Sequence, residues 1–280
     1  MKITKLIMIL AIFALASSCE KFTTEVENSS QETTNNNVSL NLTRAEQVKT
    51  VCKKVTFGIF KVDEKIGTLS QTTEEEDFGT MKFSLTPNTY RIVAIGHNGS
   101  GNCTVSSPEK ITFTNNKLTD TFYYYGLLEV KEEENVTQSI TLKRAVAMFR
   151  LNIKDDIPEN AKRIQFYYTG GSSTFNAVTG YGCVNSKQTE TFDLDPEQKT
   201  YEVYTFPHDG DKKLKMVISV LNEAGLTIAS NTFEDVVVAK NYITTYSGKL
   251  FADMSSGGTS DIEIEFEFDP EWAGENEYDF

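Results

Sequence analysis

Short runs of alternating apolar and polar residues fill the chain from residue 38 onward. β-Branched and aromatic side chains recur at every second position of these runs, and clusters of Gly, Asn, Asp and Pro separate them. A period of two predicts β-strands with one buried face. Apolar residues at helical spacing are not sustained over three turns anywhere. The expected strands are Val38–Leu42, Val55–Val62, Met81–Leu85, Tyr90–Gly96, Lys110–Phe113, Thr121–Val130, Ser139–Ile153, Arg163–Tyr168, Tyr201–Phe206, Leu214–Leu221, Leu226–Ser230, Val236–Val238, Tyr242–Phe251 and Ile262–Phe268.

The turns between these runs indicate antiparallel pairing. Asn222-Glu223-Ala224-Gly225 closes a hairpin between two alternating runs, and Thr86-Pro87-Asn88-Thr89 links two further strands. Many short antiparallel strands are typical of a sandwich or a barrel. We therefore expect an all-β protein.

The longest expected strand, 139–153, changes parity in its middle. Its apolar residues fall first on even positions, such as Ile140 and Leu142, and later on odd ones, such as Leu151 and Ile153. A change of parity moves the buried face to the other side of a strand. Either a bulge lies in the middle, or the chain passes there from one sandwich to another.

The second interpretation is favoured because about 100 residues lie on each side of the break, which is enough for a domain. We expect an N-terminal sandwich at residues 38–142 and a C-terminal sandwich at 143–269, followed by a short tail at 270–280.

The first residues of the chain have the pattern of an export signal. Lys2 and Lys5 precede the apolar run 6–16, and small residues lead from there to Cys19. The run is shorter than the roughly 20 residues that a membrane-spanning helix needs. We expect a lipoprotein signal peptide at 1–18, acylation of Cys19 with chains such as palmitate, and a flexible polar tether at 19–37. The alternative is an ordinary signal peptide cut near Cys19.

Three cysteines remain beyond the signal: Cys52, Cys103 and Cys183. An odd number in an exported chain allows at most one intramolecular disulfide, and the sequence does not fix the pairing. No second Cys or His stands at metal-ligand spacing from any of them, so we expect no zinc site.

Composition excludes one class of partner. The chain has 280 residues with 27 Lys and Arg against 40 Asp and Glu, which gives a net charge of −13. A nucleic-acid binder needs a basic face, and this chain has none in its sequence. With 39% hydrophobic and 11% aromatic residues, the chain is able to bury a core.

The sequence contains no clear catalytic constellation. His97 and His208 fall in different expected domains. The segment 97–101 (HNGSG) superficially resembles a nucleophile site, but the glycine two residues before Ser100 is missing. We therefore expect no enzyme, no metal and no cofactor.

The run LKRAVAMFRL occupies 142–151 in the middle of the chain, and further segments of note lie at 89–97, 120–124, 241–242 and 247–251. Together these segments resemble the fimbrillin superfamily of Bacteroidales, the subunits of lipoprotein-derived surface pili. In that resemblance the run 142–151 is similar to the crossing segment between the two domains of the family. The resemblance covers roughly residues 1–272 and rests on loose patterns of apolar and small residues.

The resemblance implies a fold and a way of assembly. The fold is two tandem transthyretin-like Greek-key β-sandwiches, exported as a lipoprotein to the outer membrane and the cell surface. In the shaft subunits of the family, an arginine-specific protease removes the first strand, and a strand of a neighbouring subunit fills the groove. Anchor subunits keep their lipid and stay on the membrane.

Two segments of this chain fit that scheme. A cut between Arg44 and Ala45 would release the strand 38–42. The segment 261–269 (DIEIEFEFD) is the cleanest alternation in the chain and fits a donor strand. Its buried face would consist of Ile262, Ile264, Phe266 and Phe268. The alternative is that this segment folds back as an edge strand of its own C-terminal domain.

Two functions remain from the sequence. The first is a fimbrillin-like pilus subunit or anchor, with adhesion downstream, whose partners are other fimbrial subunits, the outer membrane through the lipid, and a host surface ligand or glycan. The alternative is an outer-membrane sugar-binding lipoprotein of a polysaccharide-uptake system. Such proteins often present exposed aromatic platforms; the chain offers Trp272, the run 123–125 and the pair 167–168.

Overall fold

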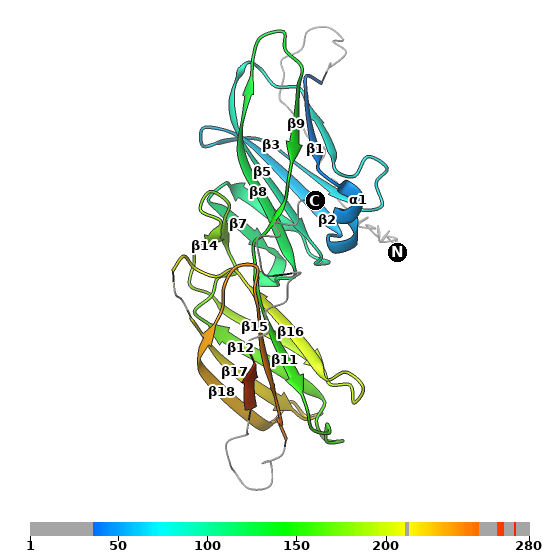
Figure 1. Cartoon of the computed structure of the whole chain (residues 1–280), viewed down its shortest axis with the longest axis vertical. Helices are drawn as coiled ribbons and strands as arrows, with labels where there is room; N and C mark the ends of the chain where they lie inside the picture. Colours follow the sequence, from blue (N-terminus) through cyan, green and yellow to red (C-terminus); the bar gives the residue numbers. More distant parts are fainter. Residues whose placement is uncertain (1–35, 211–212, 252–261, 266–271, 273–280) are drawn as a thin grey trace, which may run out of the picture. The chain divides into compact units, whose positions relative to one another are not determined.

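The computed structural model describes residues 36–210, 213–251, 262–265 and 272 (Figure 1). The helical elements are α1 (Ala45–Val51) and the 3-10 turn η1 (Thr114–Asn116). The strands are β1 (Val38–Leu42), β2 (Lys54–Lys61), β3 (Glu64–Thr72), β4 (Thr80–Phe83), β5 (Asn88–His97), β6 (Cys103–Ser107), β7 (Lys110–Phe113), β8 (Thr121–Val130), β9 (Val136–Ile140), β10 (Lys143–Arg144), β11 (Ala147–Ile153), β12 (Arg163–Thr169), β13 (Phe175–Asn176), β14 (Tyr181–Gly182), β15 (Lys187–Asp193), β16 (Thr200–Thr205), β17 (Lys213–Leu221), β18 (Thr227–Val237), β19 (Ile243–Gly248) and β20 (Ile262–Glu265).

These strands form sheets that confirm the expected all-β sandwich class. In the first half of the chain, the sheet β4-β1-β9 faces the sheet β10-β8-β5-β2-β3. In the second half, β16-β11-β19-β20 faces β15-β12-β17-β18. A smaller sheet, β14-β13-β7-β6, takes strands from both halves. No helix in the described ranges is long and apolar enough to cross a membrane.

The first core fills the space between the two sheets of the first half. Leu40 and Met81 on one sheet pack with Phe57, Ile92 and Phe122 on the other, and all five side chains are fully buried. Strand alternation explains this arrangement, because the inner residues of β1 and β4 recur at every second position.

The second core follows the same rule. Phe149 and Leu151 on β11 pack with Ile164, Phe166 and Ile218 on the opposing sheet. The Phe149 and Phe166 rings meet edge to face, with 6.3 Å between their centroids.

The parity break in the middle of the chain has a clear structural cause. The expected single strand at 139–153 is three strands: β9, β10 and β11. β10 pairs with β8 of the first half, whereas β11 pairs with β16 and β19 of the second. Ala145 and Val146, between them, are fully buried in a third apolar cluster that includes Phe113 and Phe206. Both parities are buried there because residues of both halves surround the segment.

Other elements differ from the sequence expectation. The runs 226–230 and 236–238 are parts of one long strand, β18. The helical elements α1 and η1 and the strands β3, β6, β13, β14 and β15 are absent from the sequence expectation. The hairpin turn at 222–225 is confirmed, since β17 and β18 pair antiparallel around it and Gly225 adopts a φ of 78°. The domain boundaries at 142 and 269 stay a prediction.

Candidate functional site

The strand β1 is the central strand of its sheet. It runs antiparallel to β4, with Val38 opposite Phe83, and parallel to β9, with Val38 opposite Val136. Its inner side chains, Val38, Leu40 and Leu42, are 1%, 0% and 6% exposed. β1 therefore closes a gap between two strands that do not pair with each other.

Arg44 follows two residues after β1 and is exposed. It precedes the first residue of α1 in a left-handed conformation (φ 50°, ψ 48°), and its carbonyl accepts the N–H groups of Gln47 and Val48. The Arg44–Ala45 bond therefore lies at the start of a helix of seven residues. A protease that binds an extended chain must first open the first turn of α1.

The expected donor strand is described only in part. Ile262–Glu265 forms β20, which pairs antiparallel with β19 at the edge of the sheet, with Thr245 opposite Glu265. This is the place that the fold-back alternative requires. Phe266 and Phe268 lie outside the described residues, as does Cys19. Donation of this strand stays a prediction.

A buried ion pair lies where the chain passes from the first half to the second. Arg144 donates from Nε to Oδ1 of Asp120 at 2.8 Å and from Nη2 to Oδ2 at 2.9 Å. Its Nη1 donates to Oδ1 of Asn241 at 3.1 Å. The guanidinium lies against two rings, with 4.8 Å to the centroid of Phe122 and 3.9 Å to that of Trp272. The paired hydrogen bonds to Asp120 and the two aromatic rings together hold the Arg144 guanidinium in one orientation.

Trp272 has no exposed face to offer a sugar. Its side chain is 7% exposed, and its ring also packs near Tyr204, with centroids 6.2 Å apart.

Burial raises the pKa of Asp120, and the Arg144 hydrogen bond acts in the opposite direction. The sequence did not reveal this cluster. Its only signal in the sequence is an arginine that follows Lys143 and directly precedes the apolar run 145–149.

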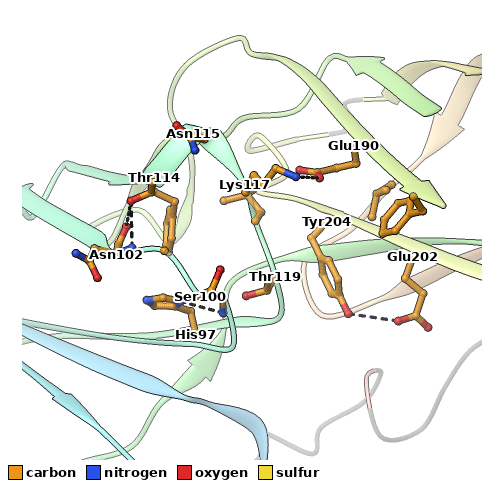
Figure 2. Close-up of a pocket in the computed structure, with 16 residues that line it drawn as sticks. His97, Ser100, Asn102, Thr114, Asn115, Lys117, Thr119, Glu190, Glu202 and Tyr204 are labelled. Atoms are coloured by element: carbon orange, nitrogen blue, oxygen red, sulfur yellow. Dashed lines mark hydrogen bonds and ion pairs between the residues drawn. The ribbon is translucent and has the colours of Figure 1, made fainter. Parts of the chain in front are cut away.

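A cavity of about 310 Å³ lies between loops of the first half and strands of the second (Figure 2). Residues 97–102 and 113–119 form one side of it, and β15 and β16 form the other. The side chains that the figure labels are His97, Ser100, Asn102, Thr114, Asn115, Lys117, Thr119, Glu190, Glu202 and Tyr204.

Three polar contacts hold the walls of this cavity. Lys117 Nζ donates to Glu190 Oε2 at 3.2 Å, which ties the loop after β7 to β15. On β16, the Tyr204 hydroxyl donates to Glu202 Oε2 at 3.4 Å, and Arg150 Nε donates to Glu202 Oε1 at 2.9 Å. Figure 2 shows the first two contacts as dashed lines. Burial raises the pKa of Tyr204, so its hydroxyl stays protonated.

His97 stands in the cavity wall and is 2% exposed. Its Nδ1 accepts the N–H of Gly99 at 3.2 Å, which places the ring proton on Nε2. Within the described residues, Nε2 is buried and has no partner. Burial, helped by Lys54, lowers the pKa of His97 to about 4. Since Gly99 already occupies Nδ1, the geometry does not form a nucleophile and base pair with Ser100.

Within the described ranges, the cysteines are free and no side-chain cluster is placed to bind a metal ion. Cys52, Cys103 and Cys183 are all free thiols; the first two are buried and the third is exposed. Burial raises the pKa of all three. No group of three or more His, Cys, Asp or Glu side chains in this part of the chain is placed to hold a metal ion.

The chain is similar to known proteins in sequence and in fold. A family model described as a family of unknown function (DUF6562) matches residues 18–280. No curated protein matches the chain. A solved structure from Bacteroides ovatus ATCC 8483, described as a candidate adhesin, has 14% identity and a TM-score of 0.50, covering 75% of this chain and 87% of its own.

Two further solved structures are similar. Another candidate adhesin from Bacteroides ovatus has 10% identity and a TM-score of 0.51, covering 81% of this chain and 91% of its own. The fimbrial anchor protein Mfa2 from Porphyromonas gingivalis has 10% identity and a TM-score of 0.45, covering 82% and 97%. The two likenesses with a TM-score of 0.50 or more confirm, for the fold, the resemblance that the sequence indicated.

Proposed function

The chain belongs to the family of unknown function DUF6562, and from this premise we propose that it is a cell-surface protein of the fimbrial or adhesin class that joins other subunits by strand exchange. The observation that carries the proposal is the position of β1 between β4 and β9.

Removal of β1 would leave a groove rather than a smaller sheet. β4 and β9 would each lose a hydrogen-bonded neighbour, and the slots for Val38, Leu40 and Leu42 would open. Burial of those three side chains supplies roughly 5–9 kcal/mol of gross apolar gain. A strand from another subunit with the same alternation restores both the main-chain pairing and the apolar contacts. The incoming strand must run antiparallel to β4 and parallel to β9.

The finer parts of the proposal follow the expectations from the sequence. Cys19 carries the lipid that holds the protein at the outer membrane. A protease cuts between Arg44 and Ala45, and the segment 261–269 of a neighbour enters the groove. The two sandwiches correspond to residues 38–142 and 143–269. Exposure of Arg44 supports this scheme.

The test begins with limited proteolysis of the mature protein under native conditions. An arginine-specific protease is expected to cut between Arg44 and Ala45, as N-terminal sequencing of the product would show. The Arg44→Lys variant is the matched control, because it keeps the charge and removes the cleavage site. Resistance of the wild-type bond at all protease concentrations that leave the fold intact would count against maturation at this site.

The second stage adds a synthetic peptide of residues 261–269 to the cleaved protein. Native mass spectrometry is expected to detect a one-to-one complex after the β1 fragment is displaced. A peptide with serine in place of Ile262, Ile264, Phe266 and Phe268 is the control and should not bind. Equal binding of both peptides, or of neither, would contradict strand exchange through this segment.

A further inference from the structure

We propose that the cavity of Figure 2 binds an uncharged saccharide of one or two rings. This inference goes beyond assembly by strand exchange, which uses β1 and the C-terminal strand and leaves these walls in place. The cavity volume of about 310 Å³ lies at the lower end of the range for small-molecule sites. Its size suits a terminal sugar unit better than a long polymer segment.

Two aromatic side chains of the cavity wall are held in fixed orientations. Phe192 on β15 meets Phe166 edge to face, with 5.8 Å between centroids, and Tyr204 on β16 is backed by Trp272. Both Phe192 and Tyr204 are half-buried. The C–H face of a sugar ring packs on such rings, and their fixed position lowers the entropy cost of binding.

The polar groups of the cavity match the hydroxyl groups of a sugar. Each sugar hydroxyl both donates and accepts, so a site needs groups of both kinds. Glu190 and Glu202 supply carboxylate acceptors, and the amides of Asn102 and Asn115 supply donors as well as acceptors. Lys117 binds Glu190 Oε2; Oε1 of Glu190 has no partner that the described residues provide. One carboxylate oxygen is thus available for a ligand.

Charge decides which sugars fit. Each carboxylate of the cavity is paired with a cation, Glu190 with Lys117 and Glu202 with Arg150, whereas the whole chain carries a net charge of −13. This field repels sialic acids, uronic acids and sulfated sugars. An uncharged saccharide is not repelled by this field.

The loop that carries Asn115 is strained. Asn115 and Asn116 both adopt left-handed conformations, with φ of 58° and 56°. Two successive residues of this kind are uncommon outside glycine and are retained where the surroundings fix them. Asn115 lines the cavity, and its fixed backbone conformation supports a site that is formed before the ligand binds.

The experiment is saturation-transfer NMR on the mature full chain with five uncharged probes: methyl β-galactoside, lactose, N-acetyllactosamine, maltose and cellobiose. 3′-Sialyllactose is the charged counterpart of lactose. At least one uncharged probe is expected to bind with millimolar affinity, and sialyllactose is expected to bind at least tenfold more weakly than lactose. Absence of binding by all five probes, or equal binding of lactose and sialyllactose, would overturn the proposal.

Variants locate the binding. Glu190→Gln removes the acceptor charge and keeps the shape, so it should weaken binding at least fivefold. Ser100→Trp adds an indole to the exposed rim and should abolish binding. Glu234→Gln is the control, since it makes the same substitution in a Lys–Glu ion pair, with Lys215, away from the cavity. Unchanged binding in folded Glu190→Gln and Ser100→Trp proteins would place the sugar elsewhere and overturn the proposal. The peptide-capture test of strand exchange is unaffected by either result.

Discussion

The indole ring of Trp272 covers the guanidinium of Arg144, with 3.9 Å between the guanidinium carbon and the ring centroid. Trp272 is the only tryptophan of the chain. Because Arg144 belongs to β10 in the middle of the chain, this contact fixes a residue of the C-terminal segment to the junction of the two halves. The pair therefore connects the end of the chain to its crossing segment.

Replacement of Trp272 tests that connection. Trp272→Ala should lower the free energy of unfolding by about 3 kcal/mol, because it removes a buried indole and its contact with the cation. Trp272→Phe keeps a smaller ring over Arg144 and should lose about 1–2 kcal/mol. Urea unfolding followed by far-UV circular dichroism measures both. A loss below about 0.5 kcal/mol in the alanine variant would show that the contact does not stabilise the fold.

The ion pair between Arg144 and Asp120 is a second point of stability. The side chains are 5% and 18% exposed, so removal of one partner leaves a charge buried. Asp120→Asn should therefore cost about 3–5 kcal/mol. The double variant Asp120→Asn with Arg144→Met should cost less than the sum of the single losses, because no charge is left behind. Strict additivity in this double-mutant cycle would contradict direct coupling.

His97 should make stability fall in mild acid. Burial lowers its pKa in the folded protein to about 4, whereas the unfolded chain has a value near 6.5. The unfolded state therefore binds the proton first as the pH falls. The contribution is complete above about pH 6.5 and is lost between about pH 6.5 and 4, up to roughly 3 kcal/mol.

The measurement compares wild type with His97→Gln at pH 7 and pH 4.5. The drop in the free energy of unfolding between the two pH values should be about 2–3 kcal/mol smaller in the variant. The comparison cancels the background from the carboxylates, which both proteins share. An identical drop in both proteins would mean that His97 titrates in the same range in the folded and unfolded states.

The thiols should differ sharply in reactivity. In a mature chain with Cys19→Ser, only Cys183 is exposed, whereas Cys52 and Cys103 are buried. Ellman's reagent should therefore label one thiol in the native protein and three in urea. Cys183→Ser should abolish the native reaction. If fewer than three thiols react in denaturant without reductant, two of the cysteines form a disulfide, which would contradict the free thiols of the structure.

Sequence patterns located the strands best where turns bound a clear alternation. β1, β7 and β8 begin and end where the apolar pattern does. β3 and β15 carry no such signal in the sequence because they are edge strands with polar side chains on both faces. An edge strand needs no continuous apolar face, so its sequence looks like a loop.

The candidate sites were less accessible from the sequence. Arg44 was visible because it follows an alternating strand directly. The cavity was not, since its walls come from segments such as 97–102 and β16 that only the fold brings together. The partner of Arg144 was also hidden: Asp120 lies 24 residues earlier, and the β8 and β10 register, with Arg144 opposite Phe122, decides their contact.

The parallel pairing of β1 with β9 has a consequence for the order of events as the chain emerges from its N-terminus and folds. β1 is among the first segments of the body to emerge, but its partner β9 follows about 100 residues later. Until β9 has emerged, β4 is the one sheet neighbour that can pair with β1. The emerging chain thus passes through a stage in which its first strand and the sheet around it are both incomplete. A chaperone that shields apolar strands could bind the chain at that stage.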